Sequence, residues 1–532
     1  MQIEHEGNDN LVKTTRSKKM ERYVLGIDAG TESIRSGIYN EKGECISFAV
    51  SENTNIHRRP GWCEQDVEQW SSSMLESIRL AFKDCLVRPE QIEGVGIDGT
   101  SCTVVYLDQE GKPLRDAIMW MDIRASREAD DIAACGDDAL KYVGYGKVSA
   151  EWFPCKNLWV KRHEREVYDQ AHTIFEHTDW MAYWLTGKIT ANINTVSIRW
   201  FYNAKEGGLP VSLYEKIGLG DIFEKIPKRV VTIGEVVGGI SKKVASATGL
   251  REGIPVAGGG ADAFIAVIGV NALKPGKLAL ITGSSQLHIG MTKAELHAPG
   301  IFGTYPSAII PGMEVVEAGQ ISTGSIIKWW VSNFLSAELK QEAKQRGISI
   351  YALLDEKAAE VPPGSEGLVV LEHWQGNRTP WVDANSRGVI RGLTLKHTPG
   401  HIFRAIMEGV AYGTAVILQR MASGGVYIDE IIACGGATKS DLWMQITADV
   451  VNKRIAIPEE QQATSLGSAI AATVAAGIYG SLNEAADRMV RMRKIIEPNP
   501  ENHEIYKEYV YQYEATYEHL KDDSKRLVST LR

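Results

Sequence analysis

The order of apolar and polar residues predicts alternating strands and helices in the first hundred positions. An apolar run begins at Tyr23, is interrupted by a Gly and acid turn at residues 28–31, and resumes as an alternating run that ends near Gly43, which predicts two strands joined by a tight loop. Residues 65–87 carry apolar side chains at helical spacing, and residues 92–98 return to a strand pattern. This alternation predicts an α/β core.

A similar pattern recurs in the second half of the chain, as a weak internal repeat. Residues 277–290 predict a strand, a small polar loop and a second strand, and residues 431–437 predict a strand that runs into a double-glycine turn. Helical periodicity follows over residues 440–451, and another helix is expected from Leu466 onward. We therefore expect two α/β halves of about 250 residues each, joined near residues 271–276, with the active site in the cleft between them.

Composition and charge exclude several classes of protein. Acidic residues outnumber basic ones, 67 to 58, and the net charge of −9 argues against a broad nucleic-acid surface. The longest run of small apolar residues, 466–480, spans about 15 positions where a membrane helix needs about 20, so we expect no membrane partner. Seven scattered cysteines without a C-x-x-C pair favour a reduced cytoplasm. Residues 1–21 lack the apolar stretch of a signal peptide and are expected to form a disordered polar tail.

Two short loops carry residues suited to binding phosphate, although the common P-loop, dinucleotide-binding and protein-kinase motifs are absent. In the first loop, Gly30 lets backbone amides approach an anion, Thr31 adds a hydroxyl, and Asp28 can hold a hydrated Mg²⁺. In the second loop, Gly283 and Ser284 offer the same amide and hydroxyl chemistry. On its own the first loop could be an ordinary hairpin turn, but the two together predict a clamp for phosphates.

Two further sites combine glycines with the start of a helix. Gly435, Gly436 and Ala437 allow close backbone approach to a flat ring, as an adenine pocket requires, although a plain strand-to-helix turn explains them equally well. Asp262 follows three consecutive glycines, 258–260, which strip away side chains so that substrate and phosphate could both come close. A carboxylate there can accept the proton of an attacking hydroxyl. The alternative, equally supported by spacing, is that Asp262 only caps the following helix.

Taken together these residues resemble the FGGY family of carbohydrate kinases, over about residues 23–480. The most specific segment is Gly388-Val-Ile-Arg-Gly-Leu393, followed after seven residues by His401-Ile-Phe-Arg-Ala-Ile-Met-Glu408. The resemblance implies an α/β fold of two ribonuclease H-like (actin-like ATPase) domains with a catalytic cleft between them. It assigns residues 22–271 to an N-terminal domain and 272–532 to a C-terminal, ATP-binding domain. It also implies ATP and Mg²⁺ as cofactors, with Asp28 at the metal and Asp262 as the general base.

Within the family, several segments resemble the ribulokinases. They are Glu151-Trp152 followed by Lys156, with Pro154 two places before the lysine, Glu317-Ala-Gly-Gln320, the segment 374–378 and the segment 98–103. Residues 120–124 resemble the family's W-x-D-x-R segment at the sugar pocket. A sugar offers hydroxyls and a carbonyl, so its pocket needs carboxylate acceptors, a cationic donor and a ring face. The expected substrate-binding residues are Asp98, Trp120, Asp122, Arg124, Lys156 and Glu317.

The resemblance implies phosphorylation of a primary hydroxyl on a ketopentose or related polyol, and it leaves the exact substrate open. The substrate could be xylulose, erythritol or glycerol, because the lysine segment departs from the ribulokinase pattern and Asp98-Gly99-Thr100 is also similar to tetritol kinases. The second phosphate loop has Gly283-Ser284 where the family often has Gly-Thr-Ser, and nucleotide binding is expected to survive this change. Asp122 and Arg124 could form a structural ion pair. An actin-like or heat-shock-like ATPase switch would use the same phosphate loops, and a catalytically silent sugar sensor is a third possibility. The expected partners are the sugar and ATP, with a homodimer as one possible assembly.

Overall fold

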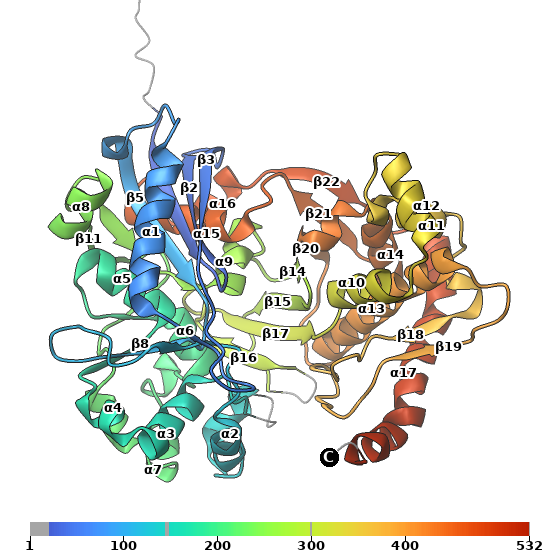
Figure 1. Ribbon diagram of the computed structural model, residues 1–532, viewed down its shortest axis with the longest axis horizontal. Helices are drawn as coiled ribbons and strands as arrows, with labels where there is room; N and C mark the ends of the chain where they lie inside the picture. Colours follow the sequence, from blue (N-terminus) through green and yellow to red (C-terminus); the bar gives the residue numbers. More distant parts are fainter. Residues whose placement is uncertain (1–20, 144–147, 298–300, 531–532) are drawn as a thin grey trace, which may run out of the picture.

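The structure, a computed structural model that describes residues 21–143, 148–297 and 301–530, contains two seven-stranded sheets (Figure 1). The tail expected over residues 1–21 lies, except for Glu21, outside the described residues. The first sheet has the order β11 (Val236–Gly239), β12 (Pro255–Ala257), β5 (Ile92–Gly99), β1 (Tyr23–Ala29), β2 (Ser33–Asn40) and β3 (Cys45–Glu52), with β13 (Gly260–Ala261) also beside β5. The second has the order β16 (Gly303–Pro306), β17 (Glu314–Gln320), β15 (Gln286–Thr292), β14 (Lys277–Thr282), β20 (Glu430–Gly435), β21 (Arg454–Pro458) and β22 (Met492–Ile496).

The two sheets share one local arrangement, which confirms the expected internal repeat. β1 pairs antiparallel with β2 and parallel with β5, and β14 pairs antiparallel with β15 and parallel with β20. Each hairpin encloses one of the two loops predicted to bind phosphate. Because parallel neighbours in each sheet end at the same edge, loops far apart in the chain are brought together there.

Helices cover the outer face of each sheet and fill the space between them (Figure 1). Helix α1 (Val67–Phe82) packs on β2 and β3 through the apolar positions that its spacing predicted, and α5 (His177–Thr186) and α8 (Lys242–Thr248) lie on the same side. The second sheet is covered by α10 (Gly324–Phe334), α12 (Ile350–Ala359), α13 (Pro399–Ser423), α14 (Asp441–Val451) and α17 (Pro500–Ser529), with α11 (Ala337–Gln345) beside α12. Between the sheets lie α9 (Asp262–Gly269), α15 (Ala463–Ala475) and α16 (Leu482–Met489).

Helix α15 comes from the second half of the chain but packs against β1 and β5 of the first sheet. Its close approach depends on Gly26, Gly94 and Gly96, since a Cβ on Gly96 would lie 1.8 Å from the carbonyl oxygen of Ser468. Side chains alternate along a strand, so Asp28, two positions after Gly26, lies on the same face as α15. The inner helices therefore border the edge at which the candidate site forms.

A smaller, four-stranded sheet with helices around it forms a separate wall beside the first sheet. Its strand order is β4 (Glu64–Gln65), β7 (Ala117–Ile118), β6 (Val104–Leu107) and β8 (Thr173–Glu176). Helices α2 (Ser126–Ala133), α3 (Phe153–His163), α4 (Arg165–Gln170), α6 (Ile193–Arg199) and α7 (Val211–Lys216) complete this part, together with the strand pair β9 (Ala191–Asn192) and β10 (Val230–Val231). A second pair, β18 (Val369–Leu371) and β19 (Val389–Arg391), belongs to the second half.

Helix α13 is long and apolar enough to cross a membrane by composition alone. However, 83% of its most apolar 18-residue window is buried inside the protein, and the helix contains the buried ion pair Arg404–Glu408. Its hydrophobicity is therefore accounted for by packing in the core of the second half.

Candidate active site

Three aspartates meet at the carboxyl edge of the first sheet. Asp28 is the penultimate residue of β1 and lies opposite Asp98 of β5 in the parallel register. Gly260 pairs with Asp98, and the chain then turns into α9, whose first residue is Asp262. The Asp262 carboxylate accepts a hydrogen bond from its neighbour's backbone, Ala263 N, at 2.7 Å. Strand register and the helix start thus bring together carboxylates that are up to 234 positions apart in the chain.

The three aspartates have different surroundings, which give them different hydrogen-bond partners and different acid–base properties. Arg35 donates from Nη1 to Oδ2 of Asp28 at 2.8 Å. Asp98 is fully buried, accepts from Ser468 Oγ at 2.6 Å, and has its pKa raised well above the usual value, first by burial and then by the charge of Asp28. Burial, and next the charge of Asp28, raise the pKa of Asp262 to about 6. A carboxylate with that pKa is ionised at neutral pH yet basic enough to accept a proton.

A cavity of about 590 Å³ opens in front of Asp28 and Asp262. The other predicted residues that line it are Gly30, Thr31, Trp120 and Glu317. Asp98 does not line this cavity; it is fully buried beside Asp28, and its Oδ2 accepts from Ser468 of α15. The cavity therefore joins the first phosphate loop, the predicted base and part of the predicted sugar pocket in one space.

The glycines at 258–260 have a different role from the expected one. A Cβ on Gly258 would lie 2.4 Å from Thr232 O, and one on Gly259 would lie 1.9 Å from Ile97 O. A Cβ on Gly260 would meet the side chain of Asn194 at 2.9 Å. The expectation that these glycines make room for substrate is wrong, because the space beside them is filled by protein; they let the segment before Asp262 pack against its neighbours.

The wall opposite the phosphate loop contains a buried polar cluster. Glu317 on β17 accepts from Tyr305 Oη at 2.7 Å and pairs with Arg199 at 3.2 Å. The Arg199 guanidinium lies near the rings of Trp152 and Phe302, 5.7 Å from each centroid. Arg199 and Glu317 both line the cavity. Sequence reasoning missed Arg199, because it belongs to none of the recognised motifs. It ends α6, a helix whose residues are all buried, and burial of this helix is not evident from its mixed sequence, INTVSIR.

A second cavity of about 520 Å³ lies in the second half of the chain, lined by Gly283, Gly436 and Ala437 together with Tyr351 and Trp443. The walls are mostly apolar, as expected of a pocket for a flat ring. A Cβ on Gly436 would meet no atom within 4 Å, so this glycine faces open space. Gly435, in contrast, has φ +92° and would place a Cβ 2.0 Å from Thr282 O, so this glycine is required by the turn itself.

The second phosphate loop lies between the two cavities. Gly283 lines the second cavity and Ser285 lines the first. The Ser284 carbonyl accepts from the backbone N–H groups of Thr323 and Ser325, at 2.9 and 3.2 Å, where α10 begins. The loop is thereby held at the start of a helix.

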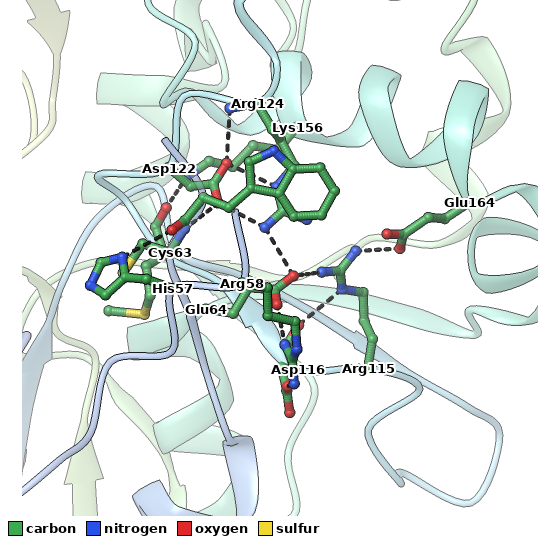
Figure 2. Close-up of polar contacts among 12 residues, drawn as sticks. His57, Arg58, Cys63, Glu64, Arg115, Asp116, Asp122, Arg124, Lys156 and Glu164 are labelled. Carbon is green, nitrogen blue, oxygen red and sulfur yellow. Dashed lines mark hydrogen bonds and ion pairs between the residues drawn. The ribbon is translucent and has the colours of Figure 1, made fainter. Parts of the chain in front are cut away.

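Three predicted sugar-binding residues lie in a buried network instead of lining the cavity (Figure 2). Lys156 is fully buried and donates from Nζ to the carbonyls of Cys102 and Met119, at 2.6 and 2.7 Å. Arg124 binds the Asp122 carboxylate through Nε and Nη2, at 2.9 and 2.7 Å. These contacts tie together the loops that carry cavity residues, and the role of the three side chains in binding sugar stays a prediction.

Comparison with known proteins agrees with this architecture. Residues 23–269 match the N-terminal domain, and residues 278–476 the C-terminal domain, of the FGGY family of carbohydrate kinases. The chain belongs to this family. It is 33% identical to a ribulokinase of Halalkalibacterium halodurans, over 95% of this chain and 97% of that protein. It is 32% identical to an FGGY carbohydrate kinase domain-containing protein of Xenopus laevis, over 92% of this chain and 95% of that one.

Solved structures show the same two-domain α/β fold. A xylulose kinase from Rhodospirillum rubrum superposes with a TM-score of 0.83 at 26% identity, covering 94% of this chain and all of that one. A glycerol kinase from Plasmodium falciparum with ADP superposes with a TM-score of 0.81 at 19% identity, covering 92% of this chain and 97% of that one. The protein is therefore a carbohydrate kinase with the fold expected from its sequence, and the resemblance to the FGGY family is confirmed.

Proposed function

We propose that this carbohydrate kinase transfers the γ-phosphoryl group of ATP to a primary hydroxyl of a ribulose-like ketopentose, with Asp262 as the general base. The observation that carries the proposal is that one cavity is lined by Asp262, by the first phosphate loop and by the polar cluster around Glu317. Support for a ketopentose comes from the ribulokinase of Halalkalibacterium halodurans, which matches almost the whole chain.

The nucleotide spans the two cavities in this proposal. The backbone at Gly436 and Ala437 borders the adenine, since Gly436 has open space where a side chain would be. The phosphates extend past Gly283 toward Gly30 and Thr31, whose amides and hydroxyl donate hydrogen bonds to anionic oxygens. Apolar walls for the ring and backbone donors for the phosphates need no basic surface, which suits a protein of net charge −9.

The carboxylate of Asp28 suits Mg²⁺. Arg35 occupies one of its oxygens, and the side chain lines the cavity where phosphates would lie. Among the described residues no group of three His, Cys, Asp or Glu side chains could hold a metal, and Mg²⁺ commonly binds through one or two carboxylates and the substrate's phosphates. When bound there, Mg²⁺ supplies charge neutralisation for the phosphates.

The sugar lies between Asp262 and the cluster of Glu317 and Arg199. Glu317 accepts hydrogen bonds from sugar hydroxyls, and its ion pair with Arg199 holds the carboxylate in place. Asp262 takes the proton from the primary hydroxyl as the hydroxyl oxygen attacks the γ-phosphorus atom. The bond from that phosphorus to the β-phosphate oxygen breaks, and ADP leaves. Closing of the two halves over the bound substrates excludes water, which would otherwise compete with the sugar.

A coupled assay of ADP production tests the proposal. Ribulose, xylulose, ribitol, erythritol and glycerol, in both enantiomers where they exist, are compared with a reaction that contains no sugar. We expect the highest kcat/KM with a ribulose, and Asp262→Asn should remove sugar-dependent turnover, while Asp130→Asn, at an exposed position on α2, serves as the matched control. Preference for glycerol or a tetritol would refute the substrate assignment, and near-normal turnover of Asp262→Asn would refute the base assignment.

A further inference from the structure

Thr31, in the first phosphate loop, is held by two side chains from outside that loop. Trp120 donates from Nε1 to Oγ1 of Thr31 at 2.9 Å, and Gln65 donates from Nε2 to the Thr31 carbonyl at 2.6 Å. An indole N–H can only donate, so the Thr31 hydroxyl is the acceptor in the first contact and its own hydrogen is free for another partner. Thr31 lines the large cavity, and an acceptor in that cavity can take this hydrogen.

The orientation of the Gln65 amide is determined by its surroundings. The side chain is fully buried. Its second N–H donates to Asn55 Oδ1 at 2.8 Å, and its oxygen accepts from Trp70 Nε1 at 2.7 Å. A flipped amide would set its oxygen against two acceptors and its N–H₂ group against a donor. Gln65 therefore presents a fixed donor to the Thr31 carbonyl.

The strand that carries Gln65 is itself anchored from its opposite face (Figure 2). β4 is two residues long, and alternate side chains of a strand point in opposite directions. While Gln65 points to Thr31, the buried Glu64 carboxylate accepts from Arg58, Arg115 and Arg124. β4 also pairs with β7, which ends shortly before Trp120. The two contacts to Thr31 thus come from paired strands, Gln65 from β4 and Trp120 from the segment that follows β7.

We infer that Gln65 is a positioning residue for the first phosphate loop, acting with the Trp120 indole to hold Thr31 so that its hydroxyl donates into the cavity. The inference rests on the proposed phosphate-binding role of Thr31. The inference also links the four-stranded sheet to nucleotide binding. Gln65 of β4 and Trp120, which follows β7, both contact Thr31 in the loop proposed to bind phosphate.

Steady-state kinetics of the full-length enzyme, with ATP and the preferred sugar varied separately, test this link. Gln65→Glu retains the shape and the acceptor for Trp70 but loses the donor to Thr31. We expect KM for ATP to rise roughly tenfold, the size of one lost hydrogen bond, while KM for the sugar changes less than twofold. Gln69→Glu, at a partly exposed position on α1 that keeps its acceptor contact with Thr54 N, is the matched control and should behave as wild type.

A loss of folded enzyme would lower kcat without changing KM for ATP, so the KM values separate positioning from simple damage. Should Gln65→Glu fail to fold, Trp120→Phe, which keeps an aromatic ring but removes the N–H, should raise KM for ATP in the same way. In a Thr31→Val background, the effect of Gln65→Glu on KM for ATP should shrink, because both changes act through one residue.

The possible outcomes distinguish this inference from the proposed function. If Thr31→Val weakens ATP binding but Gln65→Glu and Trp120→Phe leave KM for ATP within twofold of wild type, the positioning role is refuted and the phosphate role of Thr31 stands. If Thr31→Val itself leaves KM for ATP unchanged, the phosphate role fails and the inference fails with it.

Discussion

Replacing Asp262 by asparagine should greatly slow phosphoryl transfer and, at the same time, stabilise the unliganded protein at neutral pH. The two effects have one cause. Burial beside the charge of Asp28 raises the pKa of Asp262 from its usual 3.8 to about 6, which makes the carboxylate a better base and makes its ionised form unfavourable in the folded state. Asparagine is uncharged and retains an oxygen for the Ala263 N–H, so it removes the cost of the charge while preserving the local hydrogen bond.

The size of the stabilisation follows from the difference between the folded and unfolded pKa. That difference of about two units corresponds to about 3 kcal/mol, and access of solvent from the cavity should reduce it to about 1–2 kcal/mol. Since the folded pKa is the higher one, the cost of ionisation is complete above pH 6, decreases as the pH falls, and disappears below pH 3.8. The gain from Asp262→Asn should follow the same pH dependence.

Urea unfolding of wild type and Asp262→Asn, without nucleotide or metal, measures this gain at pH 7.5 and again at pH 4.5. We expect a larger free energy of unfolding for the variant at pH 7.5, a smaller difference at pH 4.5, and no difference for Asp130→Asn at either pH. Sugar-dependent ADP production should fall by roughly 10²- to 10⁴-fold. An equal or lower stability of Asp262→Asn at pH 7.5 would refute the argument from burial and charge.

Three further predictions concern the pH dependence of Asp262, the buried Lys156 and the glycines at the second cavity. The kcat/KM for the sugar should rise with pH through about 6, as Asp262 loses its proton, and a flat profile from pH 5 to 8 would contradict its role as base. Lys156→Met should lower the free energy of unfolding in urea by about 1–3 kcal/mol, since two buried carbonyls lose their donor, and should change KM for the sugar less than threefold. Unchanged stability with a tenfold higher sugar KM would instead support direct sugar contact by Lys156. Gly435→Ala should lower the thermal midpoint of unfolding by several degrees, because φ is +92° and the new Cβ would meet Thr282 O, whereas Gly436→Ala should melt as wild type does but raise KM for ATP. Equal melting of the two glycine variants would refute this contrast.

Much of the local structure could be predicted because its causes are local. The helical spacing over residues 65–87 and 440–451 produced α1 and α14, and the runs around residues 23–39 and 277–290 produced two hairpins with the same pairing. Apolar residues recur with the period of a helix or strand because one face of the element is buried. The pattern can therefore be found in the sequence before the element that packs on that face is known. The order of motifs was sufficient to recognise the family.

The candidate site was predicted less completely, because motif residues can be close to a site without facing it. Lys156, Asp122 and Arg124 belong to recognised segments, yet none of them lines the cavity. Lys156 donates to two backbone carbonyls, and Asp122 and Arg124 pair with each other. Arg199 belongs to no such segment, and only the packing of α6 beside β16, which pairs with β17, brings it to Glu317. Whether a side chain is buried, and which way it points, depends on how the layers pack together. The spacing of residues along the chain does not specify this packing.

The sequence by itself determined the α/β elements, their repetition in two halves, the family, and the glycine-containing loops in which the backbone can come close to a ligand. Only the tertiary structure decided what surrounds each loop. It filled the space beside Gly258–Gly260 with protein, left open space at Gly436, and packed α15 from the second half against β1 and β5 of the first. The physical reason is that strand and helix patterns reflect one buried face at a time, whereas a site depends on which faces meet and which side chains remain uncovered between them.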